Sequence, residues 1–431
     1  MGKTDQVRWW IVEDALRDRK GHWLEYLQTF QRGLKAEGDE VRFFASSECA
    51  PDVAALLGAD CVLPPSIWVR MSDGAAKWRR LLRIPAHGLA TYRAISRLVT
   101  RHSVGRRGDP SAQAPVHGTS NLPDLIFVPT VLVHHLVGWI PLIKWKLRDF
   151  HGRILLFFPN APVYLDNDGN AGISSDPTAK LFLLCIRALR NEVADGKVVL
   201  GAETEPMTKA LTEVTGVRFT YLPHPVELSI KYSPATRNPL PATPDKPIVF
   251  GCYGAARHEK GSDILQRAIA LVLKKRPDIS AFFVFQWMED FAAADGREVR
   301  LDPEVAAHPK VKVIREHFSE GGYERQLATT DVMLLPYRKP YQLRVSRVLI
   351  EAMLLGMPLV VTRGTTLRDQ ASRYGYAKAC DEDSAESLAE AILAMYDGHA
   401  EASGRAKACQ AEALRHFSVA EFRQRLLSKK E

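Results

Sequence analysis

The sequence lacks the marks of several protein classes. Its 431 residues include only six cysteines, scattered without metal-ligand spacing, which excludes a disulfide scaffold and a cysteine zinc site and predicts buried free thiols in a reducing compartment. It has no low-complexity tract, no nucleic-acid-binding motif and no apolar leader before its first strand pattern. These absences indicate a globular, cytoplasmic protein and disfavour a nucleic-acid partner.

One stretch without formal charges, residues 125–143, has about the length of a membrane-spanning helix. It contains two prolines, one glycine and two histidines, and its first part has the composition of a strand. We therefore expect a strand followed by a buried helix rather than a membrane span.

The charge that is present is mainly positive. The formal net charge of +8 and the pI of about 9.1 favour an anionic partner, such as a nucleotide, a phosphate or a lipid surface. Residues 77–107 contain no acidic side chain, and arginines such as Arg79, Arg80 and Arg83 alternate there with apolar residues at helical spacing. We interpret 77–121 as a basic insertion whose residues 77–107 contact an anionic membrane surface or a lipid-linked acceptor; a solvated surface and a nucleic-acid contact are the alternatives.

Apolar strand patterns alternate with amphipathic helix patterns along the chain, which is typical of an α/β protein with parallel sheets. A Pro-rich segment without periodicity, 229–246, reads as a linker between an N-terminal domain (1–228) and a C-terminal domain (247–400). Residues 401–431 are expected to be helices that pack back on the N-terminal domain. The prediction is two doubly wound, Rossmann-like domains facing across a cleft, with ligands at the carboxyl ends of their strands.

Residues 251–269, GCYGAARHEKGSDILQRAI, combine a strand end, a glycine-containing turn and a helix that starts near Ser262. A helix N-terminus offers free N–H groups to a phosphate, and glycine lets the backbone approach it. Arg257 and Lys260 precede this helix and could neutralise phosphate oxygens. The alternative is an ordinary strand–turn–helix with solvated charges.

Residues 341–362, YQLRVSRVLIEAMLLGMPLVVT, contain a second helix start of this kind. Ser346 is a good N-cap, and Arg344 and Arg347 lie at the positive end of the helix. Glu351 follows one turn later and could accept hydrogen bonds from a ribose, or form an ion pair with Arg347 or Arg344.

The order of "KG.D.L..A" from Lys260, "DVMLLPY" and "S.VLIEAMLLGMPLVVT" resembles the C-terminal domain of retaining GT-B glycosyltransferases of the group 1 (family 4) type. The segments "GHWLEYLQTFQRGLKAEGDEVRFFA" and "VTGVRFTYLPHPVEL" are similar to parts of that family's N-terminal half. The resemblance implies transfer of a sugar from a nucleotide-sugar to an acceptor hydroxyl with retention. The basic insertion adds the expectation of a lipid-linked or polysaccharide acceptor, in cell-surface polysaccharide or glycolipid synthesis at the inner face of the membrane.

The resemblance also implies site residues. Arg257 and Lys260 would hold the donor diphosphate and Glu351 the ribose, and His22 would complete the catalytic set. The remaining residues fall on the donor side (Gly254, Arg344, Ser346, Arg347 and Val348) or the acceptor side (Gly21, His22 and Asn160). His134 and His224 are further candidates for a catalytic histidine, each with a structural role as the alternative.

The sequence departs from the family at one important place. Leu343 stands where the family's paired-acid motif has its first carboxylate. A nucleotide-sugar epimerase or hydrolase and a non-catalytic sugar-nucleotide-binding protein are therefore kept as alternatives. Asp166 and Asp168 have the spacing of a metal-binding pair, but their Asn- and Gly-rich surroundings favour a turn. No cofactor and no metal are expected for the transfer, because cations and helix dipoles could stabilise the leaving diphosphate.

Overall fold

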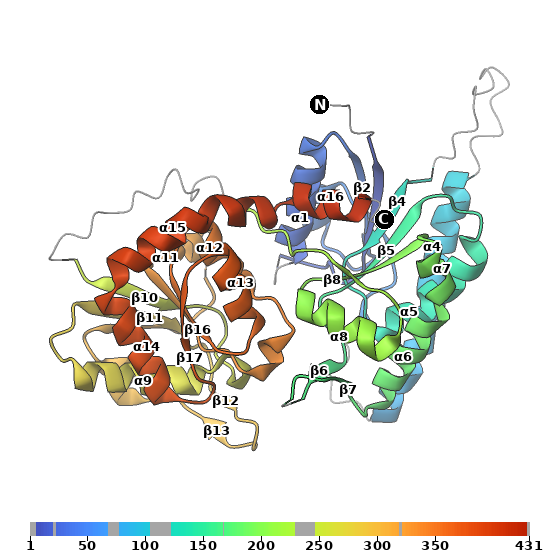
Figure 1. Cartoon of the computed structure of the whole chain (residues 1–431). Coiled ribbons are helices and arrows are strands. Elements are labelled where there is room, and N and C mark those ends of the chain that lie inside the picture. Colours follow the sequence, from blue (N-terminus) through green and yellow to red (C-terminus); the bar gives the residue numbers. More distant parts are fainter. Residues whose placement is uncertain are drawn as a thin grey trace. The chain divides into compact units, whose positions relative to one another are not determined.

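The structure is a computed structural model that describes residues 6–19, 23–67, 77–103, 122–166, 168–228, 246–318 and 321–428, with the backbone alone for 77–82. The chain divides into two compact units (Figure 1). The first comprises Met1–Pro225 with Phe422–Glu431, and the second comprises Val226–Glu421. Most of the expected linker, 229–245, lies outside the described residues.

The described part of the first unit is built around a parallel sheet in the order β3-β2-β1-β4-β5-β8-β9. Its strands are β1 (Arg8–Glu13), β2 (Glu40–Ser46), β3 (Asp60–Leu63), β4 (Leu125–Val128), β5 (Arg153–Phe158), β8 (Val198–Ala202) and β9 (Thr220–Tyr221). The strand order reverses direction between β1 and β4, which is the position where ligands bind in doubly wound sheets.

Helices flank this sheet, and a small antiparallel hairpin extends from it (Figure 1). The helices are α1 (Trp23–Ala36), α2 (Pro51–Leu57), α4 (Lys77–Ser103), α5 (Val133–Pro141), the π-helical turn η1 (Leu142–Lys146), α6 (Pro177–Ala188), α7 (Arg190–Ala194), α8 (Glu205–Thr215) and α16 (Val419–Leu427). The hairpin is formed by β6 (Val163–Leu165) and β7 (Ala171–Ile173).

The stretch 125–143 forms β4 and α5, as expected for a strand followed by a buried helix. No helix in the described ranges has the length and apolar character needed to cross a bilayer. All six cysteines are free; four are buried, and Cys61 and Cys409 are half-buried.

The C-terminal helix α16 belongs largely to the first unit. Phe422 is fully buried, with its ring centroid 4.9 Å from that of Phe30 and 5.6 Å from that of Phe127. Beside it, Arg423 donates two hydrogen bonds to Asp39, of 2.7 and 2.8 Å. The last turns of the chain therefore complete the core of this unit.

The second unit contains a parallel sheet in the order β14-β11-β10-β15-β16-β17. Its strands are β10 (Ile248–Cys252), β11 (Ala281–Gln286), β14 (Val311–Ile314), β15 (Val332–Leu335), β16 (Leu359–Thr362) and β17 (Ala377–Cys380), with a separate hairpin of β12 (Phe291–Ala292) and β13 (Glu298–Val299). Here the strand order reverses between β10 and β15.

Two apolar cores cover the two faces of this sheet. One joins the strands to α9 (Ser262–Lys275), α10 (Pro303–Ala307) and α14 (Ala385–Asp397). The other joins them to α11 (Gly322–Ala328), α12 (Arg347–Leu354), α13 (Thr366–Tyr374) and α15 (His399–His416). Two short helices, η3 (His258–Lys260) and η4 (Lys339–Gln342), follow β10 and β15. Each unit is thus a doubly wound α/β domain.

Candidate functional site

Lys260 lies over the loop that follows β10. Gly254 in this loop has a φ of +98°, and a Cβ built on it would lie 2.4 Å from the Lys260 Nζ. The backbone conformation therefore favours glycine there, and a larger residue would also displace the lysine amine. The loop is fixed by Gln286, whose side-chain oxygen accepts a 2.9 Å hydrogen bond from the Gly254 amide.

The Lys260 amine has no carboxylate in salt-bridge contact among the residues that the structure describes. Its Nζ lies 5.8 Å from the centroid of the Tyr337 ring. Burial lowers the pKa of Lys260 below its ordinary value, because the loss of hydration disfavours the ammonium form. A cation in this state is suited to an anionic ligand, which would restore the missing charge interaction.

Arg257 and Arg344 lie near each other through Glu259. Arg257 contacts Glu259 at 3.6 Å and Arg344 contacts it at 3.9 Å. The Arg257 side chain is 61% exposed, so its ion pair is weak and easily exchanged for another anion. The predicted start of the following helix is confirmed: α9 begins at Ser262, whose hydroxyl accepts a hydrogen bond from the Arg257 amide.

The second predicted helix start is also present. Ser346 caps α12, and its hydroxyl accepts a 3.3 Å hydrogen bond from the Leu349 amide. Ser346 is also in hydrogen-bond contact with the hydroxyl of Tyr337, the residue beside Lys260. Tyr337 therefore lies beside both Lys260, just before α9, and the cap of α12, at the carboxyl ends of the adjacent strands β10 and β15. Val348, in the first turn of α12, is half-buried.

Glu351 is buried, and each of its carboxylate oxygens is hydrogen-bonded. Arg347 donates to one at 2.8 Å, and the Tyr323 hydroxyl donates to the other at 2.5 Å. The ion pair with Arg347 that the sequence offered as an alternative thus exists. Burial, and then the charge of Glu351, raise the pKa of Tyr323 well above its ordinary value, so its hydroxyl stays a donor.

Sequence reasoning missed the residue that holds these loops together. Arg338, buried just after β15, donates two hydrogen bonds to Asp263 on α9, of 2.8 and 2.9 Å, and also contacts Asp383. Its backbone amide donates to the Glu259 carbonyl. Because a bidentate arginine–carboxylate pair fixes both distance and angle, it aligns the α9 start with the loop after β15. Asp263 was visible in the "KG.D" pattern, but no local signal links it to Arg338.

The residues predicted for the acceptor side lie in the first unit. Gly21 and His22 fall outside the described residues. Asn160 is exposed in the turn after β5. His224 contacts Glu203 at 3.2 Å and stacks on Tyr26, which is the bonding of a structural histidine. His134 is buried at the start of α5.

The Asp166 region is a tight turn between β6 and β7. One carboxylate oxygen of Asp166 accepts hydrogen bonds from the amides of Asp168 and Asn170, at 2.9 and 2.8 Å, and the other accepts one from the Asn170 side chain. These bonds lower the pKa of Asp166. Its oxygens thus serve the turn, as the composition of the segment predicted.

The comparisons agree with this architecture. Residues 247–398 match the family model "Glycosyl transferases group 1". A search of curated proteins finds no match.

Three similar solved structures cover nearly the whole chain. The glycosyltransferase from Rickettsia africae ESF-5 is 11% identical, with a TM-score of 0.61, and covers 98% of this chain and 100% of its own. Anabaena HepE in complex with UDP and glucose is 13% identical, with a TM-score of 0.58 and 98% of each chain covered. Sucrose-phosphate synthase from Thermosynechococcus elongatus is 15% identical, with a TM-score of 0.57 and 97% and 96% covered. The chain has the GT-B fold of these structures, and its residues 247–398 match the glycosyl transferases group 1 family.

Proposed function

We propose that the protein moves a sugar from a nucleotide-sugar donor to an acceptor hydroxyl with retention of configuration, and that the donor binds in the second unit. The observation that carries this proposal is Lys260, a lysine with no carboxylate partner among the described residues, held over Gly254 at the point where the strand order reverses. In this proposal the donor diphosphate is its anionic partner. HepE, a structure of the same fold, was solved with UDP and glucose, so uridine nucleotides are the first donors to test.

The rest of the donor site follows from the same loops. In our proposal, the first amides of α9 and α12 and the exposed Arg257 receive further phosphate oxygens, and Arg344 lies within reach of them through Glu259. Glu351 receives the ribose hydroxyls. Its carboxylate would accept them beside the bonds that Arg347 and Tyr323 donate.

The chemistry that this arrangement supports is departure of a diphosphate. As the bond breaks, the sugar acquires positive charge and the leaving oxygen acquires negative charge. A fixed cation stabilises the negative charge on the leaving oxygen. The leaving phosphate can then accept the proton of the acceptor hydroxyl on the same face of the sugar, which gives retention. Leu343, which is buried, supplies no carboxylate to the sugar, so we assign donor-sugar contacts to other groups of the loop. The transfer proposed in this way requires no metal.

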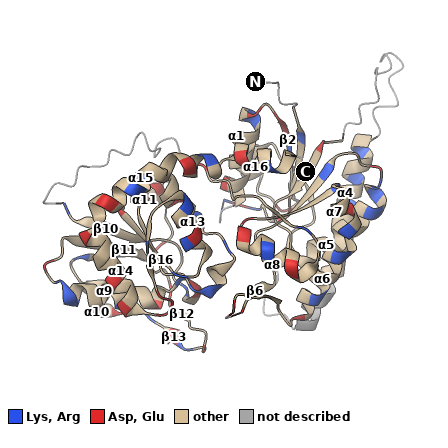
Figure 2. Ribbon diagram, in the orientation of Figure 1, with Lys and Arg blue, Asp and Glu red and all other residues tan. Residues whose placement is uncertain are grey.

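The acceptor side is assigned to the first unit, at the turn that holds Asn160. We further propose that this unit rests on an anionic membrane that carries the acceptor. Lys and Arg recur along α4 (Figure 2), and Arg93, Arg97 and Arg101 are exposed at successive turns of it.

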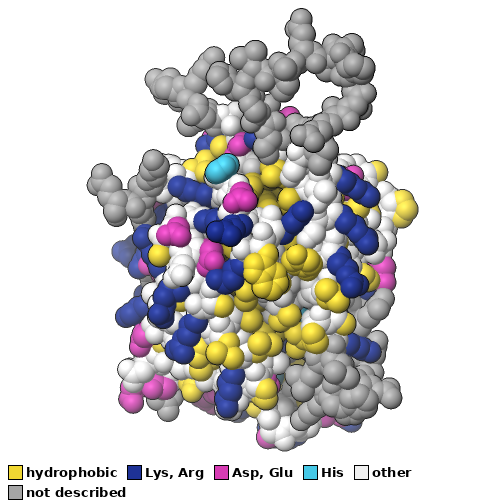
Figure 3. All heavy atoms as spheres, turned by 90° about the vertical axis from the view of Figure 1, so that its right-hand side faces the viewer, with side chains coloured by type: hydrophobic (Ala, Val, Ile, Leu, Met, Phe, Trp, Pro, Cys, Tyr) yellow, Lys and Arg dark blue, Asp and Glu magenta, His cyan; other side chains and the backbone are white. Residues whose placement is uncertain are grey.

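Three apolar side chains support this membrane contact. The face that carries α4, η1 and α6 shows hydrophobic side chains gathered together with Lys and Arg around them (Figure 3). Each of these elements carries an exposed apolar residue: Leu89 on α4, Trp145 on η1 and Leu184 on α6 are 49%, 72% and 65% exposed. An aromatic and leucine patch within a basic surround suits the headgroup region of an anionic bilayer.

The donor proposal is tested by thermal unfolding of the purified protein with UDP-, GDP-, ADP- and TDP-sugars, since a ligand of the native state raises the melting temperature. We expect one base to stabilise the protein and the matching nucleotide-sugar to be consumed only when an acceptor is present. Consumption without acceptor would instead support the epimerase or hydrolase alternative, and tight binding without turnover on any acceptor would support a binding protein. No stabilisation by any of the four would refute the donor proposal.

The membrane proposal is tested by sedimentation with vesicles of anionic or zwitterionic phospholipid. We expect binding to anionic vesicles alone, and its loss in Trp145→Ser and in a variant that removes the charges of Arg79, Arg80 and Arg83. Leu414→Ser, which changes an exposed apolar residue of the second unit, is the matched control. Unchanged binding by the Trp145 and arginine variants would refute the membrane contact.

A further inference from the structure

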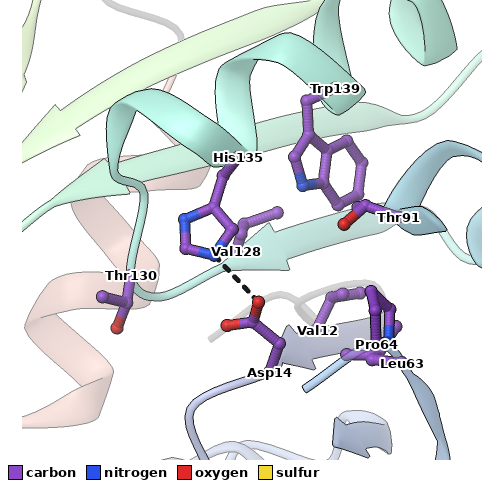
Figure 4. Close-up of a pocket in the computed structure, with 9 residues that line it drawn as sticks. All are labelled: Val12, Asp14, Leu63, Pro64, Thr91, Val128, Thr130, His135 and Trp139. Carbon is purple, nitrogen blue, oxygen red and sulfur yellow. Dashed lines mark hydrogen bonds and ion pairs between the residues drawn. The ribbon is translucent and has the colours of Figure 1, made fainter. Parts of the chain in front are cut away.

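Four buried side chains meet where the strand order of the first sheet reverses. Asp14 follows β1, His134 and His135 begin the helix after β4, and His87 comes from the middle of α4 (Figure 4 shows Asp14 and His135). Each is at most 8% exposed, and one potential ligand atom from each lies within 4.8 Å of the others. None of these residues takes part in the donor site proposed above.

Two glycines bring His87 to this position. A Cβ built on Gly138 of α5 would lie 2.6 Å from the carbonyl oxygen of Gly88, so α4 and α5 touch through their backbones. No other residue type fits such a crossing without moving a helix. The neighbour of Gly88, His87, then reaches the Asp14 carboxylate, with 2.9 Å between its Nε2 and the Asp14 Oδ2.

The hydrogen bonds of His135 fix its role. Its Nδ1 accepts a 2.9 Å hydrogen bond from the Leu132 amide, so this nitrogen carries no proton. The proton of the neutral ring is then on Nε2, which donates to Asp14 over 3.0 Å. His135 therefore orients the carboxylate, and its nitrogens are not available to bind an ion.

The other two histidines are differently placed. Both ring nitrogens of His87 and the Nε2 of His134 are buried without a well-directed hydrogen bond, although the His87 Nε2 is close to Asp14. Such atoms are costly unless they have a partner.

The charge around this cluster is not balanced by protein cations. Glu13 and Asp14 are both buried, and no lysine or arginine in the described ranges forms a salt bridge with either. A divalent cation would compensate this charge and occupy the unused nitrogen atoms.

We propose that Asp14, His87 and His134 bind a divalent transition-metal ion of the zinc class, with His135 holding the Asp14 carboxylate from behind. Zinc–ligand distances of about 2.0–2.2 Å place two ligand atoms about 3.3 Å apart in a tetrahedral site. The spacing of 2.9 Å for one pair, and of at most 4.8 Å for all, needs only small side-chain movements to reach this geometry. A ligating carboxylate held by a second residue is the usual arrangement around such ions.

Three protein ligands leave one coordination position for water or for a small ligand. A pocket with room for about a single water molecule adjoins Asp14 and His135 (Figure 4). Thr91 and Thr130 line it; the Thr91 hydroxyl has no hydrogen-bond partner in the described part of the chain, whereas the Thr130 hydroxyl is in contact with Glu13. We assign the fourth position to this pocket, where the Thr91 hydroxyl would be the partner of a water molecule on the ion.

The test uses the full chain without a polyhistidine tag, stripped with a chelator and dialysed against Zn²⁺ or Co²⁺. With Zn²⁺ we expect about one bound equivalent, measured by elemental mass spectrometry, and a rise in melting temperature. With Co²⁺ we expect the visible absorption of a four-coordinate ion. His134→Ala should weaken Zn²⁺ binding at least 100-fold, and His135→Ala should weaken it about 10- to 100-fold. His151→Ala, at an exposed position, is the control and should bind as the wild type does.

These measurements do not depend on donor binding or sugar transfer, so they can fail while the proposed function holds. Wild-type protein that binds much less than one equivalent, or a Co²⁺ spectrum of six-coordinate type, would overturn the proposal even if the variants did not fold. Equal Zn²⁺ affinity of wild type and folded His134→Ala would also overturn it.

Discussion

The substitution Lys260→Met tests whether Lys260 binds the donor diphosphate or stabilises the fold. Methionine keeps the length of the side chain and removes the charge, which has no carboxylate partner among the described residues. The free protein therefore loses no ion pair, and its free energy of unfolding should stay within about 0.5 kcal/mol of the wild type or rise. If Lys260 stabilised the fold, the substitution would instead lower the free energy of unfolding.

Nucleotide binding should change in the other direction. The substitution removes one charged hydrogen bond to the diphosphate, worth about 1.5–3 kcal/mol, which corresponds to a Kd about 10- to 150-fold higher. The assay is calorimetric titration with the nucleoside diphosphate that stabilises the wild type, beside urea unfolding of both proteins. Lys274→Met on the exposed end of α9 is the matched control, and its Kd should be unchanged.

The pH dependence gives a second readout of the same lysine. Because burial lowers the pKa of Lys260 in the folded protein, the unfolded chain holds more protons between that lowered pKa and the ordinary value. Wild-type stability should thus rise relative to Lys260→Met as the pH increases through this window, while diphosphate affinity falls. A variant that loses about 2 kcal/mol of stability and keeps its Kd would refute the reasoning.

Three further outcomes are expected. Gly254→Ala places a methyl group 2.4 Å from the Lys260 Nζ at a φ of +98°. It should weaken diphosphate binding at least tenfold in the same titration. Gly296→Ala, which is also at positive φ but has open space around it, should leave the binding unchanged. Arg338→Met leaves the Asp263 carboxylate without its bidentate partner, and urea unfolding should show a loss of about 3–5 kcal/mol; a loss below about 1 kcal/mol would contradict that pair's role. Glu351→Gln should lower the affinity for a nucleoside diphosphate but not for its 2′,3′-dideoxy analogue. An equal loss of affinity for both would refute the assignment of Glu351 to the ribose.

Much of the second unit could be predicted because its signals are local. The Ser346 cap and the start of α9 at Ser262 depend on residues within one helical turn, and both are confirmed. The alternation of strands and helices likewise gave two doubly wound domains before any contact was known. Gly254 was identifiable as part of the turn, although its approach to the Lys260 amine was not.

The remaining features depend on residues far apart in the sequence. Arg338 and Asp263 are separated by 75 positions, and His135 and Asp14 by 121. The histidines of the first unit were visible, but their convergence on Asp14 requires the close approach of α4 and α5 at Gly88. Neither spacing nor periodicity encodes such a meeting, because the sheet order and a helix crossing decide it.

The central claim is that the donor diphosphate is held in the second unit by Lys260. A crystal structure with the stabilising nucleoside diphosphate tests it most directly. The account predicts diphosphate oxygens within about 3.2 Å of the Lys260 Nζ, beside Gly254 and the first turn of α12. A diphosphate bound elsewhere, with the Lys260 amine contacting only protein or solvent, would contradict it.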